Sequence, residues 1–207
     1  MDSEDGHYRG LLVDYGGVLT SDLFDSFRSF CELEQLESDA VGDRFRRDPA
    51  CRELLIALET GTLEEEEFEL QFAAILGVGA PGLIDRLFAG SSPDESMLDA
   101  VLRARRAGIR TGLISNSWGT RRYDRRLLAE LFDGIVISGE VGIRKPKPEM
   151  YELGAQRIGL DTRACVFVDD LPFNLVPAAQ LGMATVHHVS SWQTIDQLER
   201  LLGVGLR

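Results

Sequence analysis

Residues 11–20 constrain the fold of this chain more than any other stretch. A short apolar run, Leu-Leu-Val, stops at Asp14 and passes at once into Gly16 and Gly17. Apolar runs of this length bounded by glycine are typical of a central parallel strand, and ligands of open α/β sheets bind just beyond the carboxyl ends of such strands. The stretch therefore predicts a carboxylate at the binding edge of a sheet. The alternative is that Asp14 merely caps a turn.

The second half of the chain alternates apolar strands with amphipathic helices. Alternation of this kind predicts an α/β fold with a doubly wound parallel sheet, helices on both faces and right-handed crossovers. The expected later strands are 109–114, 134–138, 165–168 and 184–189, and the expected helices include 148–158 and 174–181.

Residues 21–92 carry a different pattern, in which apolar residues recur every three to four positions without any strand-like run. Thr62 and Glu65 have the spacing of a capping box at the start of one of these helices. We therefore expect a core made of 1–20 and 93–207, with 21–92 inserted as a small helical domain.

Composition excludes several classes of protein. A formal charge of −12 argues against a general nucleic-acid binder, because affinity for phosphate backbones depends on clustered positive charge. No apolar run approaches the ~20 residues of a membrane span, and the first ten residues are acidic rather than basic. Three widely separated cysteines fit neither a disulfide framework nor a zinc site. We expect a cytoplasmic protein that binds neither nucleic acid nor membrane, and the sequence leaves its oligomeric state open.

Polar side chains follow three of the expected strands at the point where each strand ends. They are Asp14, Ser115 and the pair Asp169 and Asp170. Parallel strands bring their carboxyl ends to one edge of the sheet, so we expect these side chains to meet there. Clustered carboxylates raise one another's pKa unless a cation lies among them, and Mg²⁺ prefers oxygen ligands. The sequence therefore predicts a magnesium site.

Lys145 is one of only two lysines in the chain, the other being Lys147. Pro146 restricts the backbone beside it and Pro148 can open the following helix, which places Lys145 at a loop-to-helix junction near the sheet edge. A fixed ammonium there can neutralise both a nucleophilic carboxylate and an incoming phosphate. The alternative is an ordinary surface lysine.

With these segments, the sequence resembles the haloacid dehalogenase superfamily of phosphohydrolases over essentially its whole length. Three motifs carry the resemblance: Ser115 after an apolar strand, the run Arg-Lys-Pro-Lys-Pro-Glu-Met-Tyr around Lys145, and the run Val-Asp-Asp-Leu-Pro-Phe-Asn ending at Asn174. Residues 58–68 match the leucine, glycine and phenylalanine pattern of the small cap found in the subgroup of the dehalogenases and the phosphatase domain of soluble epoxide hydrolase. The resemblance implies a doubly wound core with a mobile helical cap.

The resemblance also implies catalytic roles for the matching residues. Asp14 would be the nucleophile that forms an aspartyl-phosphate. Ser115 and the backbone of Asn116 would bind the phosphate of a small phosphorylated metabolite, and Lys145 would neutralise both the nucleophile and the phosphate. The cap would admit the substrate and exclude water.

For the metal, the resemblance implies Mg²⁺ bound directly by the carboxylates of Asp14 and Asp170. The backbone carbonyl of Gly16 would be a further ligand. Asp169 would lie outside the direct ligand set and orient Lys145 or a metal-bound water.

Gly16 departs from the first motif of the family, whose phosphatases carry a second Asp two residues after the nucleophile. That Asp protonates the leaving group and later deprotonates the attacking water, a role worth ~10²–10⁴ in rate. Glycine keeps only the carbonyl, so we expect slow turnover limited to substrates with acidic leaving groups, such as acyl or aryl phosphates. Tyr15 is a poor substitute acid, because its ordinary pKa is near 10.

Three other functions are alternatives to a magnesium-dependent phosphatase. A catalytically weak or dead relative would use the same pocket to bind a phosphorylated ligand or a protein partner, and Gly16 favours it. A metal-independent dehalogenase is disfavoured, because dehalogenases lack the acidic pair that Asp169 and Asp170 form. Phosphonate cleavage requires a cap lysine, and residues 21–92 contain none.

Two further groups of charged residues have simpler interpretations. Arg121, Arg122, Arg125 and Arg126 are expected to be surface charges of a helix, although they could also draw anionic substrates toward the pocket. His187 and His188 follow the last strand without a partner motif and are expected to be structural.

Overall fold

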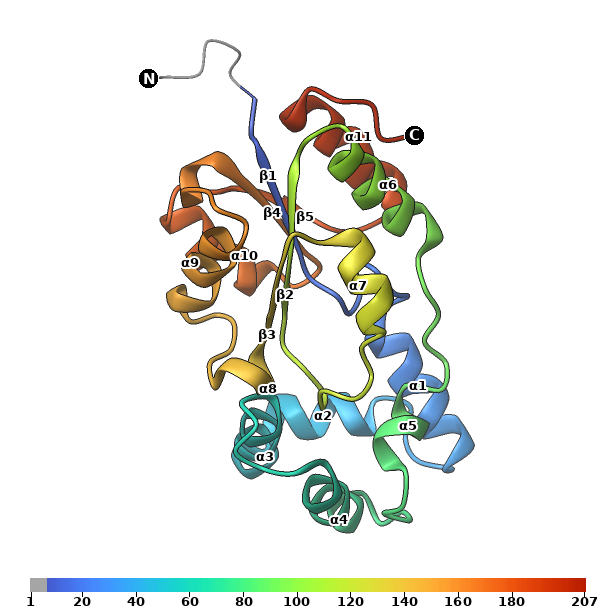
Figure 1. Ribbon diagram of the computed structural model, residues 1–207. Coiled ribbons are helices and arrows are strands. Elements are labelled where there is room, and N and C mark those ends of the chain that lie inside the picture. Colours follow the sequence, from blue (N-terminus) through green and yellow to red (C-terminus); the bar gives the residue numbers. More distant parts are fainter. Residues whose placement is uncertain (1–6) are drawn as a thin grey trace.

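The computed structural model describes residues 7–207, so the acidic start and the first six residues of the expected core lie outside the described residues. Five parallel strands form one sheet in the order β3-β2-β1-β4-β5 (Figure 1). Their bounds are Gly10–Val13 for β1, Arg110–Ser115 for β2, Gly134–Ile137 for β3, Cys165–Asp169 for β4 and Ala184–His187 for β5. The expected doubly wound α/β fold is confirmed, and β1 is its central strand.

Helices cover both faces of the sheet because its strands are apolar on both sides. Leu11 and Val13 of β1 pack in a cluster on one face and Leu12 packs in a second cluster on the other. The first face is covered by α6 (Glu95–Arg106), α7 (Arg125–Leu131) and α11 (Ser191–Leu202), and the second by α9 (Pro148–Arg157) and α10 (Pro172–Gln180). Two short elements, α8 (Ser138–Val141) and a 3₁₀ turn (Thr162–Ala164), lie between strands and helices.

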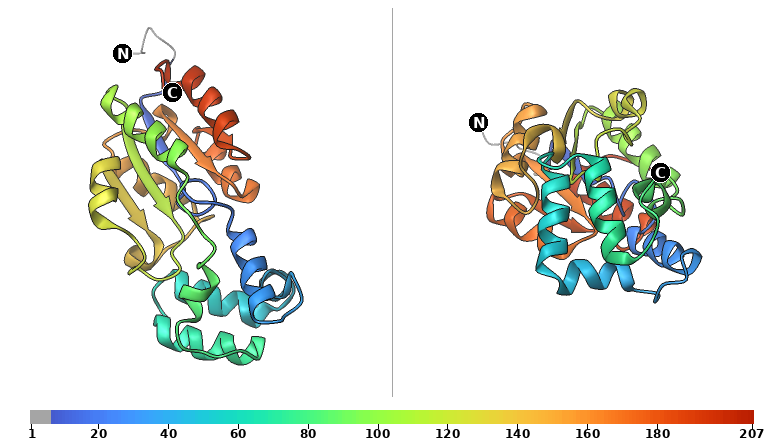
Figure 2. Two further views of the ribbon diagram at one scale, coloured as in Figure 1. Left: turned by 90° about the vertical axis from the view of Figure 1, so that its right-hand side faces the viewer. Right: turned by 90° about the horizontal axis from the view of Figure 1, so that it is seen from below.

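The helical insertion, residues 21–92, forms a separate layer beyond the carboxyl ends of the strands (Figure 2). It contains α1 (Leu23–Leu33), α2 (Ala40–Arg47), α3 (Pro49–Glu59), α4 (Glu65–Leu76) and α5 (Leu83–Leu87). These helices share a buried cluster of their own, rich in phenylalanine, that is distinct from the two clusters beside the sheet.

Two neighbouring chain segments join the helical insertion to the sheet. Thr20 and Pro93 form an isolated antiparallel bridge. The amide of Ser21 donates to the carbonyl of Ser92 at 2.8 Å, and the amide of Asp94 donates to the carbonyl of Leu19 at 2.9 Å. The two connections between the helical insertion and the sheet therefore run side by side.

The start of α4 differs from the capping box expected at Thr62. The N-cap residue is Glu64, whose side chain makes no capping hydrogen bond. The Thr62 hydroxyl instead donates to the carbonyl of Ala57 at 3.1 Å, in the last turn of α3. The Thr62 hydroxyl therefore satisfies a carbonyl at the end of α3 and does not cap α4.

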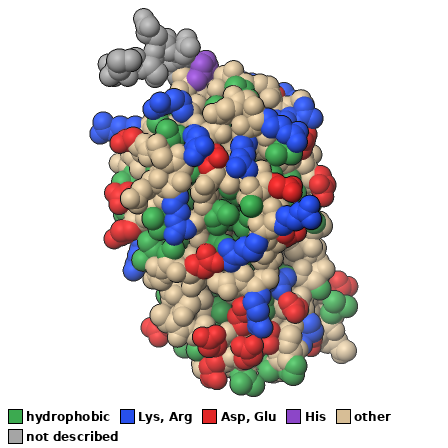
Figure 3. Space-filling model, in the orientation of Figure 1, with side chains coloured by type: hydrophobic (Ala, Val, Ile, Leu, Met, Phe, Trp, Pro, Cys, Tyr) green, Lys and Arg blue, Asp and Glu red, His purple; other side chains and the backbone are tan. Residues whose placement is uncertain are grey.

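No helix among residues 7–207 is both long and apolar enough to cross a membrane. The three cysteines, Cys31, Cys51 and Cys165, are buried and free, as expected from their spacing. On the face shown in Figure 3, acidic side chains gather at the lower end, where α4 begins with Glu65, Glu66 and Glu67.

Candidate active site

The central strand and its two neighbours bring the predicted site residues together. Val13 is in register with Val168 of β4 and with Leu113 of β2, and the Asp14 amide donates to the carbonyl of Val168 at 3.0 Å. Asp14 therefore lies level with Asp169, at the edge that faces the helical insertion. The alternative that Asp14 only caps a turn does not account for this convergence.

Lys145 lies between two carboxylates at this edge. Its Nζ atom is 2.8 Å from Oδ1 of Asp14 and 2.6 Å from Oδ2 of Asp169, and the side chain is fully buried over the ring of Phe167. Burial opposes the charged ammonium, but the two carboxylates outweigh it and raise the pKa of Lys145. Lys145 is therefore a permanent cation of the site and not a surface lysine.

The backbone of Lys145 is fixed by the side chain of Asn116. The Lys145 amide donates to Oδ1 of Asn116 at 2.8 Å, and Nδ2 of Asn116 donates to the Lys145 carbonyl at 3.1 Å. The loop after β2 thus positions the lysine, a use of the Asn116 side chain that the sequence pattern did not indicate. The predicted phosphate contact of Asn116 involves its backbone and is compatible with this arrangement.

Asp169 is committed to hydrogen bonds on both of its oxygens. Oδ2 accepts from Lys145, and Oδ1 accepts from the Leu171 amide and from Nδ2 of Asn174, each at 2.9 Å. Asn174 is fixed in turn, since its carbonyl accepts from the Tyr151 hydroxyl at 2.7 Å. Asp169 is fully buried, so its carboxylate has the geometry of an orienting group rather than a solvent-facing ligand.

Three carboxylates form a cluster that fits a divalent cation. One oxygen from each of Asp14, Asp169 and Asp170 lies within 4.8 Å of the other two. Burial and the nearby Asp169 raise the pKa of Asp170 to about 6, and burial raises that of Asp14 despite Lys145. Hard oxygen donors that repel one another in this way favour a cation such as Mg²⁺ between them.

Gly17 allows Asp170 to approach the turn after β1. Its φ angle is +73°, and a Cβ atom there would lie 2.7 Å from Cγ of Asp170. A side chain at this position would therefore displace the carboxylate as well as strain the turn.

Tyr123 is a site residue that the sequence pattern missed. Its hydroxyl lies 2.8 Å from Oγ of Ser115, and both groups are buried. Burial raises the pKa of Tyr123, so the phenol keeps its proton and can donate it to Ser115. The Ser115 hydroxyl is then free to donate to an anion in the pocket.

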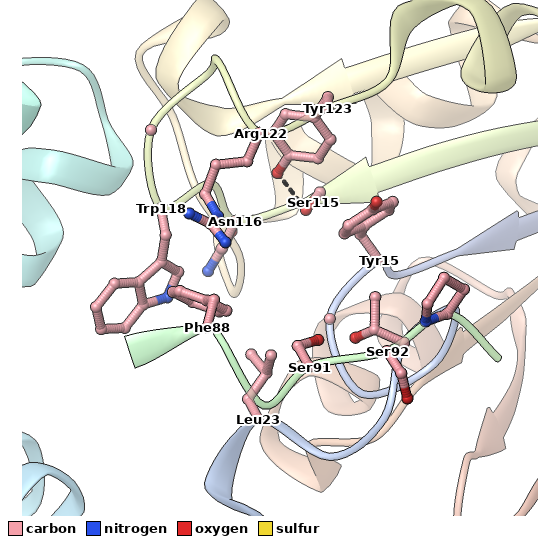
Figure 4. A pocket seen from close by; sticks show the side chains of 14 residues that line it. Tyr15, Leu23, Phe88, Ser91, Ser92, Ser115, Asn116, Trp118, Arg122 and Tyr123 are labelled. Atoms are coloured by element: carbon pink, nitrogen blue, oxygen red, sulfur yellow. Dashed lines mark hydrogen bonds between the residues drawn. The ribbon is translucent and has the colours of Figure 1, made fainter. Parts of the chain in front are cut away.

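A cavity of about 210 Å³ opens beside these strand ends, toward the helical insertion (Figure 4). One end is formed by Ser115, Asn116 and the turn at Tyr15 and Gly16. The remaining lining residues are mostly apolar or aromatic, with a few hydroxyls and one guanidinium: Thr20, Leu23, Phe88, Ser91, Ser92, Pro93, Trp118, Gly119, Arg122 and Tyr123.

Leu23, the first residue of α1, occupies the space beside Gly16. A Cβ atom on Gly16 would lie 2.8 Å from Cδ1 and 3.3 Å from Cγ of Leu23. An apolar side chain from the helical insertion therefore fills the place where a side chain at position 16 would begin. No sequence pattern linked the two residues, because Leu23 looks like an ordinary helix residue.

Two of the four arginines after β2 join the sheet domain to the helical insertion. Arg121 pairs with Glu65 at 2.8 Å and with Glu66 at 3.2 Å, and Arg122 pairs with Asp85 of α5. Both are exposed, as expected, but they lie in the turn before α7 and not in a helix. A polar turn that precedes the helix places them opposite the acidic helical insertion.

The remaining charged residues of this group behave as expected from sequence. Arg126 pairs with Glu130 at 3.7 Å along α7, and Arg125 pairs with Glu140. Each histidine has one hydrogen-bond partner: Nε2 of His187 lies 3.0 Å from the carbonyl of Asp170, and Nδ1 of His188 lies 3.0 Å from Oγ1 of Thr194.

A model of the haloacid dehalogenase-like hydrolase family matches residues 8–182. The chain therefore belongs to this family and is a hydrolase, which confirms the family expected from the motifs.

Among curated proteins, the sesquiterpene phosphatase astK of Aspergillus oryzae is 25% identical over 206 residues, which cover 95% of this chain and 97% of that protein. Bifunctional epoxide hydrolase 2 of Sus scrofa is 30% identical over 131 residues, which cover 60% of this chain and 24% of that protein. The chain thus spans about a quarter of the length of the epoxide hydrolases it matches.

Among solved structures, a predicted HAD-like family hydrolase from Porphyromonas gingivalis has a TM-score of 0.71 and 25% identity, and the match covers 95% of this chain and 98% of that one. A HAD family enzyme from Bacteroides thetaiotaomicron has a TM-score of 0.67 and 22% identity, with 87% and 93% covered. That enzyme was solved as a mutant in complex with magnesium and inorganic phosphate.

Proposed function

We propose that this hydrolase is a magnesium-dependent phosphatase that acts on a small phosphorylated metabolite through an aspartyl-phosphate on Asp14. The observation that carries the proposal is the position of Lys145 between Asp14 and Asp169, beside the carboxylate of Asp170. A buried ammonium next to three carboxylates serves no packing purpose that an apolar residue would not serve better. It fits a site that binds a phosphate and a cation together.

In this proposal, Oδ1 of Asp14 accepts hydrogen bonds from the Tyr15 amide at 2.7 Å and from Lys145. This fixes the carboxylate and leaves Oδ2 as the attacking oxygen. The Ser115 hydroxyl, released by Tyr123, binds the phosphate together with the backbone of Asn116. Lys145 neutralises the charge that builds up on the phosphoryl oxygens.

Asp14, Asp170 and the carbonyl of Gly16 would bind Mg²⁺, with Asp169 orienting Lys145. When bound, the cation lowers the pKa of the clustered carboxylates and stabilises negative charge on the transferred phosphoryl group. The magnesium and phosphate found with the Bacteroides enzyme support this assignment.

Two broader aspects of the proposal concern architecture and location. The helical insertion is a cap over the site, supported by its separate apolar cluster and by the cavity beneath it. Three buried free cysteines support a reducing compartment such as the cytoplasm.

Turnover is slow in this proposal, because position 16 carries no acid and Leu23 fills the adjoining space. The same observation favours a second candidate function, a relative that binds a phosphorylated ligand without turning it over. Assays with acetyl phosphate and phenyl phosphate, with and without Mg²⁺, separate the two. We expect metal-dependent phosphate release that Asp14→Asn abolishes. If the wild type releases no more phosphate than Asp14→Asn, the binding function is the one supported.

A further inference from the structure

The cavity beside Ser115 and Asn116 has aromatic side chains on two sides. Phe88 and Trp118 form one wall and Tyr15 forms the opposite side, as Figure 4 shows. The rings of Phe88 and Trp118 meet nearly edge to face, with centroids 5.3 Å apart. Aromatic walls of this kind favour another ring between them, through offset or edge contacts worth several-fold in affinity each.

Trp118 makes this wall rigid. It comes from the loop after β2, yet its ring lies among phenylalanines of the helical insertion, with centroids 5.5 Å from Phe27, 5.5 Å from Phe45 and 5.8 Å from Phe68. A side chain packed on several sides cannot rotate to accommodate different substrates. The wall formed by Phe88 and Trp118 therefore discriminates between substrates by their shape.

Arg122 places a positive charge at the same wall. Its guanidinium lies over the Phe88 ring, 4.7 Å from the centroid, and it pairs with the exposed carboxylate of Asp85. A guanidinium that lines the cavity attracts the negative charge that develops on a leaving oxygen.

The lining of the cavity restricts the leaving group. Gly16 has no side chain and none of the lining residues carries a carboxyl group, so no carboxylic acid of the cavity can protonate the leaving oxygen. The leaving oxygen must therefore depart as a stable anion. A phenol has a pKa of about 10, compared with about 15.7 for water, so an aryl oxide leaves far more readily than an oxygen of low acidity.

We propose that the substrate is the phosphate monoester of an aromatic hydroxyl, whose ring lies against Phe88 and Trp118 and whose oxygen leaves without protonation by the protein. This inference rests on the proposed phosphatase function and names its substrate class. Asp14 Oδ2 forms a bond to phosphorus as the bond from phosphorus to the aryl oxygen breaks, and the aryl oxide keeps the electron pair. Water then attacks phosphorus, which returns the Asp14 carboxylate, releases inorganic phosphate and gives a proton to solvent.

Three esters test the two halves of the proposal with the wild-type protein and Mg²⁺. Phenyl phosphate has both the ring and the acidic leaving group, benzyl phosphate keeps the ring but releases an alcohol, and acetyl phosphate has an acidic leaving group without a ring. We expect kcat/KM for phenyl phosphate to exceed that for benzyl phosphate by ~10²-fold or more. We expect KM for phenyl phosphate to be about tenfold below that for acetyl phosphate. Equal kcat/KM for phenyl phosphate and benzyl phosphate would overturn the proposal. Equal KM for phenyl phosphate and acetyl phosphate would overturn it as well.

A binding measurement separates failure of this inference from failure of the proposed function. Phenylphosphonate and methylphosphonate cannot be hydrolysed at oxygen, and calorimetry gives their affinities directly. Tighter binding of phenylphosphonate supports the ring site even if none of the three esters is turned over, a result that would overturn only the phosphatase function. Equal affinities would overturn the ring site.

Substitutions in the cavity test where the aromatic ring of the substrate lies. Phe88→Leu keeps apolar volume and should raise KM for phenyl phosphate several-fold while leaving KM for acetyl phosphate unchanged. Trp192→Ala is the matched control, because Trp192 is an exposed aromatic residue on α11 that does not line the cavity. If Phe88→Leu changed KM equally for phenyl phosphate and acetyl phosphate, this would contradict the placement of the ring against Phe88.

Discussion

The side chain of Leu23 fills the space next to Gly16 in which an acidic side chain would begin. The Cδ1 atom of Leu23 lies 2.8 Å from the position of a Cβ atom on Gly16. The loss of the acid at position 16 and the apolar residue from the helical insertion are therefore complementary. Together they make this part of the site apolar.

We predict that restoring the acid at position 16 is most effective when Leu23 is also made smaller. Gly16→Asp alone should give the smaller gain on benzyl phosphate, because the new side chain must displace the end of the Leu23 side chain. Gly16→Asp combined with Leu23→Ala should raise kcat by ~10²-fold or more, the usual contribution of a general acid and base. Leu23→Ala alone is the control, and steady-state kinetics are the measurement. A double variant no faster than this control would show that the pocket is not arranged for phosphatase chemistry.

Tyr123→Phe should weaken phosphate binding without disrupting the fold. The substitution removes the hydroxyl that lies 2.8 Å from Ser115, so the serine loses the partner that directs its own proton toward the phosphate. We expect kcat/KM to fall about tenfold, equivalent to about 1.4 kcal/mol, with a matching loss of inhibition by inorganic phosphate. Tyr8→Phe, at the opposite end of the sheet, controls for loss of a phenol. Unchanged inhibition would remove Tyr123 from the site.

A magnesium site at the carboxylate cluster should be visible without any enzyme assay. Saturating Mg²⁺ should raise the melting temperature of the wild-type protein. At a Mg²⁺ concentration one hundred times Kd, the free energy of unfolding should rise by about 2.7 kcal/mol. Asp170→Asn should lose most of this increase because it removes a ligand of the cluster. Asp39→Asn is the control, because Asp39 is an exposed residue of the helical insertion and the substitution removes the same charge away from the cluster. This variant should keep the increase in melting temperature. An equal shift in both variants would place the cation at another site.

Glu59 should make stability depend on pH. It is buried at the end of α3 and pairs with Arg144, the residue before Lys145. Burial raises the pKa of Glu59 to about 7 from a usual value near 4.5, so the folded state binds more protons than the unfolded state between these values. Protonation of Glu59 therefore contributes fully to the free energy of unfolding below about pH 4.5. This contribution is lost as the pH rises through 7.

The measurement is the free energy of unfolding by denaturant at several pH values. We expect the wild type to lose on the order of 3 kcal/mol more than Glu59→Gln between pH 5 and pH 8, since the amide cannot titrate. Parallel pH profiles for the two proteins would contradict the raised pKa of Glu59.

Much of the fold could be predicted from sequence because the strands are short apolar runs that end in polar residues. Asp14, Ser115 and Asp169 each mark such an end, and a parallel sheet brings them together. The expected last strand was too long, since β5 ends at His187. The helix α11 was not expected, although it has an apolar face with Ile195 and Leu198 buried.

The features that shape the cavity could not be predicted, because they join residues of different structural elements. Leu23 reaches Gly16 only after α1 folds over the sheet edge. Trp118 follows β2 but packs with phenylalanines of the helical insertion. Such contacts depend on how two layers meet, which local spacing does not encode.

Phosphorylation of Asp14 is the most direct test of the proposed mechanism. Wild-type protein would be mixed with phenyl phosphate and Mg²⁺, quenched in acid during turnover, and digested for mass spectrometry. We predict one phosphoryl group on the peptide that contains Asp14, and none in the Asp14→Asn variant treated in the same way. Release of phosphate by the wild type without phosphorylation of Asp14, or with phosphorylation of another residue, would contradict the assignment of Asp14 as the nucleophile.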